Sequence, residues 1–364
     1  MKRREFLKAA GLSAAATATA VAMPAVAQSM PEIKWRLTSS FPKSLDTLYG
    51  ASEDVTKFVA EATDNKFQIQ SFAAGEIVPG LQAMDAVSNG TVEACHTAAY
   101  YFVGKDPTFA LFCAVPFGLN ARQQNAWFID GDGQKLFVEF GQKYNIYPLV
   151  SGNTGTQMGG WFRKELKTPE DFVGLKFRIG GFAGKTIQKL GGVPQQLAGG
   201  DIYPALEKGT IDAAEWVGPY DDEKLGFYKV AKYYYYPGWW EGGTALHLFI
   251  NTNKWAELPK SYQAIVTAAT AYANTAVTAK YDARNPAALK RLISGGAVLQ
   301  PFSQSIMDAS LKHADEVFAE TSAANADFKK VWNSITAFRG EEYLWWQVAD
   351  YTYDTFMIRN RTKL

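Results

Sequence analysis

Residues 203–220, YPALEKGTIDAAEWVGPY, decide the fold because they repeat, without gaps, the pattern of residues 84–101, MDAVSNGTVEACHTAAYY. In each stretch a helical pattern ends at a Gly-Thr pair, and a short apolar run follows. Glycine just after a helix commonly adopts the left-handed conformation that ends it. In open α/β sheets, ligands bind at the loops after the carboxyl ends of strands. The repeat therefore predicts two lobes whose loops face each other across a cleft. Chance similarity is the alternative, since helix–glycine–strand units are common.

The rest of the chain alternates strand and helix patterns, which is typical of an α/β fold. Residues 32–40 are extended, residues 44–63 carry apolar side chains at helical spacing, and residues 66–75 alternate like a strand. The chain has 364 residues, more than a single core usually supports. Glycine-rich connections at residues 144–163 and 238–255 predict a hinge. We also expect a long helix to begin at Lys260 and to end at Pro286.

The first 27 residues have the pattern of a removable export leader. Basic residues precede a weakly apolar run and a small-residue site at Ala25-Val26-Ala27. Adjacent arginines, Arg3-Arg4, followed by Phe6-Leu7-Lys8, resemble the twin-arginine class. A membrane anchor is the alternative, but the run between Lys8 and Pro24 is short and rich in Ala and Thr. We therefore expect a periplasmic protein.

Charge and cysteine content exclude several classes of function. The chain carries 37 Lys and Arg against 36 Asp and Glu, so nothing in its charge predicts binding to nucleic acid or to a membrane surface. Its two cysteines, Cys95 and Cys113, are too few for a disulfide framework. We expect two buried thiols rather than a bridge.

The C-terminal residues 341–360, EEYLWWQVADYTYDTFMIRN, predict a helix that is apolar around most of its circumference. Such a helix is normally covered. It packs either on its own subunit or on a second one, and the pattern alone favours neither.

Motifs for catalysis are absent from the sequence. The three histidines are scattered, and there is no H-E-x-x-H, C-x-x-C or G-x-S-x-G motif. Gly184-Lys185-Thr186 resembles the end of a phosphate-binding loop, but Ile179 occupies the position of its first glycine. These absences favour a binding protein over an enzyme.

Two charged residues are candidates for a binding site. Arg178 lies late in a predicted strand, where a guanidinium is costly to bury without an anion, and its planar fork suits a carboxylate. A structural ion pair with an acidic residue is the alternative. Glu215 follows the predicted strand of the second repeat, where its carboxylate and nearby oxygens could bind a hard cation. An ordinary acid at the end of a strand is the alternative for Glu215.

Three stretches together carry a family resemblance: GLKFRIGGFAGKTIQKLGGVPQQLAGGDIYPALEKGTIDAAEW (174–216), AAGEIVPGLQAMDAVSNGTVEACHTAAYY (73–101) and LHLFINTNKWAELP (246–259). They resemble the solute receptors of tripartite ATP-independent periplasmic (TRAP) transporters, and within them the receptors for 2-oxo acids and lactate. The resemblance covers nearly the whole chain after the leader. It implies an α/β, two-lobed periplasmic-binding-protein fold with hinge connections and a long spine helix. The domains would be a leader (1–27), one lobe with the spine helix (28–153 and 243–300), a second lobe (154–242 and 301–338) and a C-terminal helix (339–364) that contacts a second subunit.

The resemblance also implies roles for individual residues. Arg178 would hold the ligand's carboxylate, and Gln157 in NTGTQMGG would contact both the ligand and a cation. Glu215, the carbonyl of Trp216, and Glu241 in GWWEGG would complete the cation's shell. Two further wall residues are expected, Asn153 and Tyr100.

Charge balance bears on the identity of the cation. Glu215, Glu241 and a monocarboxylate bring three negative charges, and Arg178 offsets one. Ca²⁺ would balance the remainder, whereas Na⁺ suits a site in which Glu241 faces water. An unbalanced buried charge costs several kcal/mol. Both Ca²⁺ and Na⁺ therefore stay open.

We accordingly expect a periplasmic receptor that binds a small 2-oxo or 2-hydroxy monocarboxylate, such as pyruvate or lactate, with one metal cation and delivers it to a TRAP membrane permease. A receptor for a sugar acid and an exported metal-assisted enzyme are the alternatives. Removing Arg178 should abolish binding and leave the fold intact.

Overall fold

The structure, a computed structural model, describes residues 30–362. The predicted leader, residues 1–27, lies outside this range. The chain divides into a unit that ends at Ile33 and a unit that begins at Lys34. The fold and the site described below belong to the second unit.

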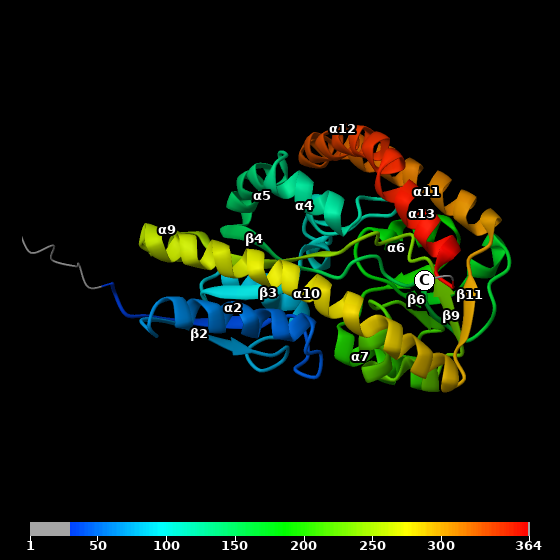
Figure 1. Cartoon of the computed structure of the whole chain (residues 1–364), viewed down its shortest axis with the longest axis horizontal. Helices are drawn as coiled ribbons and strands as arrows, with labels where there is room; N and C mark the ends of the chain where they lie inside the picture. Colours follow the sequence, from blue (N-terminus) through cyan, green and yellow to red (C-terminus); the bar gives the residue numbers. More distant parts are fainter. Residues whose placement is uncertain (1–29, 363–364) are drawn as a thin grey trace, which may run out of the picture. The chain divides into compact units, whose positions relative to one another are not determined.

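The first lobe is built on a five-stranded sheet in the order β2-β1-β3-β10-β4, of which Figure 1 labels β2, β3 and β4. β3 pairs in parallel with β1, and β10 is antiparallel to both β3 and β4. Its strands are β1 (Ile33–Ser39), β2 (Phe67–Phe72), β3 (Ala94–Ala98), β4 (Ile146–Asn153) and β10 (Ala245–Asn251). Its helices are α2 (Leu48–Ala62), α3 (Ala83–Ser88), α4 (Ala121–Ile129), α5 (Gly133–Gly141) and α9 (Thr252–Glu257), with short 3-10 turns η1 (Gly80–Gln82), η2 (Ala99–Phe102), η3 (Pro107–Phe112) and η4 (Gln142–Tyr144).

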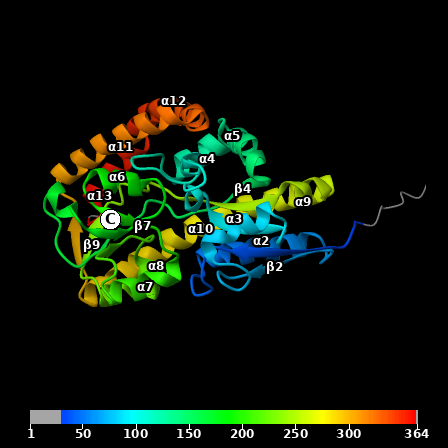
Figure 2. The same cartoon turned by 180° about the vertical axis from the view of Figure 1, so that it is seen from behind.

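The second lobe is built on a six-stranded sheet in the order β11-β9-β5-β8-β6-β7. Figure 2 shows two of its strands, β7 and β9, from behind. Its strands are β5 (Gly160–Phe162), β6 (Lys176–Arg178), β7 (Val193–Gln195), β8 (Ala213–Ala214), β9 (Tyr233–Tyr236) and β11 (Val298–Pro301). Its helices are α6 (Ala183–Lys189), α7 (Gly199–Glu207) and α8 (Pro219–Leu225), with 3-10 turns η5 (Pro169–Phe172) and η6 (Phe227–Lys229). The tyrosine run of residues 233–236 is therefore a strand.

The two copies of the sequence repeat have the same order of helix, glycine and strand in the structure. α3 is followed by Gly90 at φ 79° and then β3, and α7 is followed by Gly209 at φ 71° and then β8. Both glycines have the left-handed conformation expected of a helix-terminating position. β3 lies inside the first sheet and β8 inside the second, so each lobe contains one copy.

A single helix, α10 (Lys260–Ser294), packs against α2 and β4 of the first lobe and α8 of the second. The expectation that Pro286 ends this helix is wrong, because Pro286 lies inside it. An internal proline costs a helix about 3 kcal/mol. Buried Tyr281, Ala288 and Leu292 anchor the helix on both sides of Pro286, so tertiary packing outweighs that cost.

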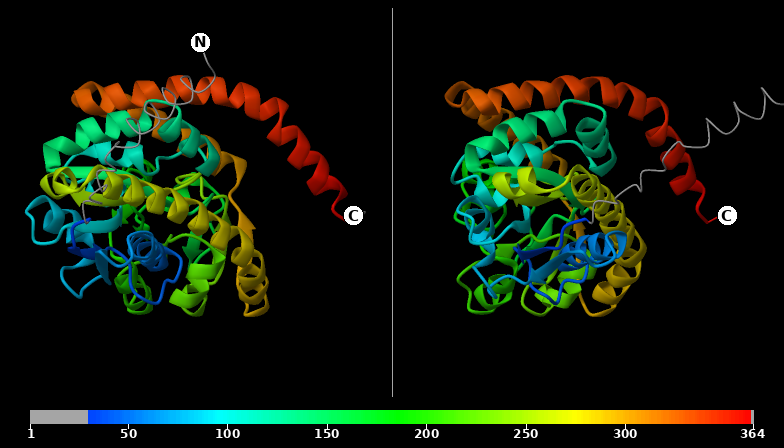
Figure 3. Two further views of the ribbon diagram at one scale, coloured as in Figure 1. Left: turned by 60° about the vertical axis from the view of Figure 1, so that its left-hand side comes forward. Right: turned by 90° about the vertical axis from the view of Figure 1, so that its left-hand side faces the viewer.

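The C-terminal part of the described chain consists of α11 (Gln304–Ala324), α12 (Ala326–Val348) and α13 (Asp350–Asn360). α11 packs on α6, and α12 packs on α4 and α5. The predicted helix over residues 341–360 is interrupted at Ala349 (φ −93°, ψ −88°), and α13 extends beyond the body of the unit (Figure 3). We retain the domain bounds given above as a proposal.

Cys95 and Cys113 are buried free thiols, as predicted. No helix among residues 30–362 is both long and apolar enough to cross a bilayer.

Candidate functional site

A small cavity of about 10 Å³ lies where the two lobes meet. Cavities that bind drug-sized molecules usually measure roughly 300–1,000 Å³, so side chains nearly fill this one and the lobes are closed on each other. Both lobes and the connections between them line it: Phe41, Leu48, Ala98, Tyr100, Tyr101, Thr154, Gln157, Trp216, Val217, Thr244 and Leu246.

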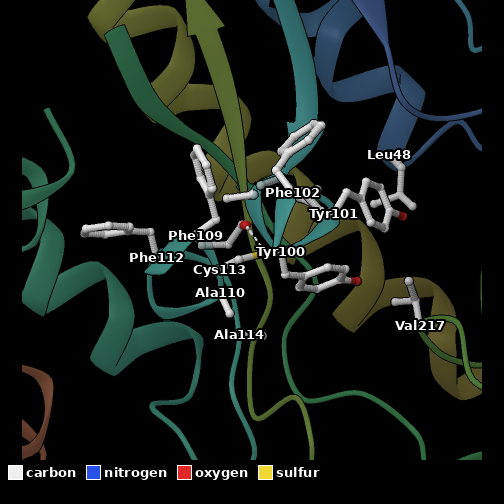
Figure 4. Close-up of a cluster of buried hydrophobic side chains, with 14 of the residues drawn as sticks. Leu48, Tyr100, Tyr101, Phe102, Phe109, Ala110, Phe112, Cys113, Ala114 and Val217 are labelled. Carbon is white, nitrogen blue, oxygen red and sulfur yellow. Dashed lines mark hydrogen bonds between the residues drawn. The ribbon is translucent and has the colours of Figure 1, made fainter. Parts of the chain in front are cut away.

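The first repeat delivers two tyrosines to this cavity, Tyr100 and Tyr101, in the 3-10 turn directly after β3. Figure 4 shows Tyr101 beside Leu48 and the hydroxyl end of Tyr100 directed toward Val217. Burial raises the pKa of both hydroxyls, and the charge on Glu241 raises that of Tyr100 further. Both therefore stay protonated at neutral pH and can donate hydrogen bonds to an anion.

Glycines of the second lobe allow close packing on Tyr100. A Cβ atom on Gly180 or Gly181 would lie 2.8 or 2.7 Å from the Tyr100 side chain. The Gly-rich stretch before Lys185 thus serves the contact between the lobes rather than a phosphate loop.

The second lobe contributes the charged pair Arg178 and Glu215, both completely buried. Arg178 ends β6, and its Nη1 donates to Glu215 Oε1 at 2.5 Å and to the Glu215 carbonyl at 2.8 Å. Its Nε and Nη2 each donate to the Leu197 carbonyl at 3.2 Å. The Trp216 ring, which lines the cavity, lies 5.0 Å from the guanidinium carbon. The ion pair that the sequence left open is thus present, and these contacts involve four of the five N–H donors of the arginine.

Glu215 uses only one of its carboxylate oxygens in these contacts. Oε1 also accepts the Gly180 N–H at 2.7 Å, whereas Oε2 is buried and has no hydrogen-bond partner among the described residues. Burial raises the pKa of Glu215, although the Arg178 charge and the Gly180 N–H oppose the shift.

Gln157 and Glu241 come together at the connections between the lobes. The Gln157 N–H donates to the Glu241 carbonyl at 3.1 Å, and Gln157 Nε2 donates to Thr154 Oγ1 at 3.2 Å and Thr244 Oγ1 at 2.9 Å. The Thr244 hydroxyl in turn donates to the Glu241 carboxylate. Gln157 Oε1 is buried and has no hydrogen-bond partner within residues 30–362. Burial and then the charge on Glu215 raise the pKa of Glu241 well above its ordinary value.

These residues fit a hard cation. Two unpartnered buried oxygens, Glu215 Oε2 and Gln157 Oε1, and a second buried carboxylate are oxygen ligands of the kind that Ca²⁺ and Na⁺ prefer. A positive charge would also relieve the repulsion between Glu215 and Glu241. Among residues 30–362 no group of three or more His, Cys, Asp or Glu side chains could hold a metal ion, so neutral oxygens such as those of Gln157 and Trp216 would have to complete the shell.

Asn153 has different contacts. Its Nδ2 donates to Gln124 Oε1 at 2.7 Å, and its Oδ1 accepts the Gly155 N–H at 3.0 Å. It is not among the residues that line the cavity. Its predicted role as a wall residue has no support in these contacts, which give it a structural role at the end of β4.

Sequence reasoning missed several residues that line the cavity. Tyr101 directly follows Tyr100 in the first repeat and could have been found there. Thr244 follows the predicted hinge glycines. Leu48 and Val217 carried no signal, because an apolar residue at helical spacing or beside a strand is normally explained by the core.

Comparison with known proteins places this arrangement in a family. Residues 38–325 match the model of the bacterial extracellular solute-binding proteins, family 7 (DctP). The chain is 49% identical to a monocarboxylate 2-oxoacid-binding periplasmic protein of Nostoc sp., over 98% of this chain and 99% of that protein.

Two solved structures are similar throughout. A TRAP transporter solute-binding protein from Bordetella bronchiseptica, a mixed-occupancy dimer with calcium and picolinate in one site, has a TM-score of 0.90 and 48% identity over 92% of this chain and 99% of its own. A TRAP periplasmic solute-binding protein from Pseudoalteromonas atlantica with bound sodium and pyruvate has a TM-score of 0.86 and 38% identity over 88% of this chain and 98% of its own. The chain therefore belongs to family 7 of the bacterial extracellular solute-binding proteins, the DctP family of TRAP transporter receptors.

Proposed function

We propose that this protein is a periplasmic receptor that binds a small 2-oxo or 2-hydroxy monocarboxylate together with one cation and delivers it to a TRAP permease. One observation carries the proposal: a buried arginine and two buried carboxylates lie within electrostatic reach of a small cavity closed by both lobes. The relatives support it, since one is named for 2-oxoacid binding and another contains pyruvate with sodium.

The division of labour follows from the hydrogen bonds. Arg178 has one N–H beyond the four that contact Leu197 and Glu215, and a ligand carboxylate would compete with the Leu197 carbonyl and with Glu215 for the others. Glu215 can serve Arg178 through Oε1 and a cation through Oε2 at the same time. The hydroxyls of Tyr100 and Tyr101 would close on the ligand from the first lobe.

The protonation state of Glu241 decides which cation balances the site. With both glutamates ionised, a bound monocarboxylate and Arg178 leave two negative charges, which Ca²⁺ neutralises. Because the pKa of Glu241 is raised well above its ordinary value, the protonated form is also accessible, and Na⁺ then balances the site. Relatives with calcium and with sodium are both known.

Isothermal titration calorimetry tests the proposal. Pyruvate, lactate and galacturonate are titrated into the purified chain with Ca²⁺, with Na⁺, or with chelator in sodium-free buffer. We expect binding of pyruvate or lactate that requires one of the two cations, and no binding of galacturonate. Binding that is insensitive to both cations contradicts the cation role, and absence of binding to any 2-oxo or 2-hydroxy monocarboxylate contradicts the ligand class. Turnover of either acid would favour the metal-assisted enzyme.

We also propose that the protein is a homodimer joined through α12 and α13. Large apolar side chains on these helices are 48–71% exposed: Tyr343, Leu344, Trp345, Val348, Tyr351, Tyr353, Phe356 and Ile358. So large an apolar surface is typical of a site for another protein surface. Arg122 holds the start of α13 through Asp350 at 2.5 Å, and the dimeric Bordetella relative supports a second copy as the occupant.

Light scattering after size-exclusion chromatography measures this association. Leu344→Asp together with Phe356→Asp should yield monomers, while Ile129→Asp, at a residue that is 81% exposed on α4, should leave the mass unchanged. A double variant that remains dimeric contradicts the proposed interface.

A further inference from the structure

Residues 46–48 of the first lobe link the cavity to the second lobe, since Leu48 lines the cavity and its two neighbours contact the second lobe. Leu48 lies on the cavity wall and is 1% exposed. The preceding Thr47 donates its hydroxyl to Asp221 Oδ1 at 2.7 Å, and Thr47 and Asp221 are both fully buried. Asp46 accepts the Tyr220 hydroxyl at 3.0 Å and pairs with Lys224.

The second lobe likewise has an aliphatic residue on the cavity wall, next to side chains that contact the other lobe. Val217 lies on the cavity wall, and its N–H donates to Asp222 Oδ1 at 3.3 Å, at the start of α8. Asp221 also accepts the Tyr281 hydroxyl of α10 at 2.6 Å. Leu48 in the first lobe and Val217 in the second are thus aliphatic wall residues that lie close in the chain to side chains that join the lobes.

We propose that Leu48 and Val217 determine which ligands this receptor accepts, by limiting the length of the ligand's carbon chain, and that Asp46 and Thr47 are positioning residues that hold this aliphatic wall closed. The inference rests on the proposed function and extends it. The charged groups select ligands that have a carboxylate, and the aliphatic wall selects among them by the length of the carbon chain.

The coupling follows from chain geometry. Leu48 is buried at the start of α2, so a ligand that pushes its backbone also moves the adjoining Thr47 and Asp46, because consecutive Cα atoms are held about 3.8 Å apart. An overlong ligand would therefore stretch the buried Thr47–Asp221 bond and the contacts of Asp46 with α8. Arg284 of the spine helix donates to Asp46 at 2.8 Å and adds to that resistance. A ligand that fits leaves all of these contacts in place.

The two groups of residues predict different outcomes on truncation. Removing methyl groups from the wall changes the ranking of ligands, since each additional methylene that finds room is worth about fourfold in affinity. Weakening the contacts between the lobes lowers the population of the closed form, which reduces the affinity for every ligand by the same factor.

Calorimetry with pyruvate, 2-oxobutanoate, 2-oxopentanoate and 4-methyl-2-oxopentanoate separates these outcomes in the purified chain. Leu48→Ala and Val217→Ala should each raise the affinity for the longer acids relative to pyruvate by about fourfold per methylene. Asp46→Asn and Thr47→Val should weaken all four acids equally, and the loss with Asp46→Asn should shrink at high salt because Asp46 is half exposed.

Matched controls are available on the same lobe. Val55→Ala truncates a buried side chain of α2 outside the cavity, and Asp54→Asn breaks an ion pair with Lys280 of α10 instead of one with α8. Neither should change the ranking. Melting temperatures without ligand establish that each variant is folded. If Leu48→Ala does not fold, Val217→Ala alone tests the role of the aliphatic wall.

An unchanged ranking in the folded wall variants overturns the inference, as does a changed ranking in Asp46→Asn. A parent chain that binds neither lactate nor any of the four acids overturns the proposed function itself. The two failures are therefore distinguishable.

Discussion

The loops that follow β3 and β8 share a backbone arrangement but carry different chemistry. Each comes after a helix, a glycine with positive φ and a buried strand. The loop after β3 brings two uncharged hydroxyls, Tyr100 and Tyr101, to the cavity. The loop after β8 brings Glu215 and Trp216, beside Arg178 of the neighbouring strand.

This difference shows how two copies of one backbone arrangement can contribute different groups to a binding site. Burying an unpaired charge costs far more than burying a hydroxyl. If the charged groups sit on one lobe, they can be paired and desolvated there before the lobes close. The other lobe then closes with neutral donors, and closure requires no further desolvation of charge from that side.

Removal of Arg178 is the strongest way to break this comparison. Arg178→Ala leaves the Glu215 carboxylate buried without its partner, a loss that typically costs about 3–5 kcal/mol. The expectation that the fold stays intact is therefore revised: we expect lower stability as well as lost binding. Urea unfolding should show this loss, and the double variant Arg178→Ala/Glu215→Ala should recover much of it. Arg163→Ala, on an exposed side chain, is the control. A single variant within 1 kcal/mol of the parent would contradict the pairing argument.

Glu215→Gln sharpens the comparison by removing charge but little volume. Even outer-shell partners of a metal are worth roughly 10–100-fold in affinity, so we expect a loss of about 100-fold for pyruvate. The chelator should then have no further effect in calorimetry. Glu207→Gln, at an exposed position on α7, should behave as the parent. If pyruvate binding by Glu215→Gln still depended on the cation, the cation site would have to lie away from Glu215.

The second lobe also contains buried acids beyond its loop. Burial raises the pKa of Asp221 to about 6 and that of Asp222 to about 7, against an ordinary value of 3.8. The folded state therefore holds protons that the unfolded state has lost, so the contribution of these two groups to stability is fully present below about pH 4 and is lost as pH rises through about 7. The slope approaches about 1.4 kcal/mol per pH unit for each proton.

Unfolding measured across this pH range checks the direction of the effect. Asp222→Asn should flatten the slope, because the amide cannot ionise, while Asp201→Asn on an exposed side chain should leave it unchanged. A slope of the opposite sign that Asp222→Asn abolishes would contradict the raised pKa of Asp222.

The smallest loss of affinity should come from a substitution in the first lobe, which brings only uncharged hydroxyls to the cavity. Tyr101→Phe removes one hydroxyl that faces the cavity, and a neutral hydrogen bond contributes about 0.5–1.5 kcal/mol. Calorimetry should show a correspondingly modest loss for pyruvate, with Tyr272→Phe, 53% exposed on α10, as the control. A loss larger than that of Glu215→Gln would reverse the comparison.

Much of the fold and part of the candidate site were predictable from local patterns. The repeat predicted two lobes because glycine after a helix and a short apolar strand are local features. Arg178 was placed at a strand end by alternation. The prediction that Pro286 ends the helix was wrong. The cost of an internal proline can be estimated from the local sequence, but the packing of α10 on both lobes, which outweighs that cost, cannot. Asn153 was assigned to the ligand wall, but Gln124, far away in sequence, engages its amide.

The amino-acid sequence alone determined the alternation of strands and helices, the repeated loops and the residue types that can bind an anion and a cation, since these depend on neighbours in the chain. Tertiary structure alone decided that Arg178 pairs with Glu215, that Glu241 shares their electrostatic field, and that Leu48 and Val217 line one cavity. The physical reason is that burial, charge coupling and cavity shape arise between residues far apart in sequence, and no local pattern encodes their distances.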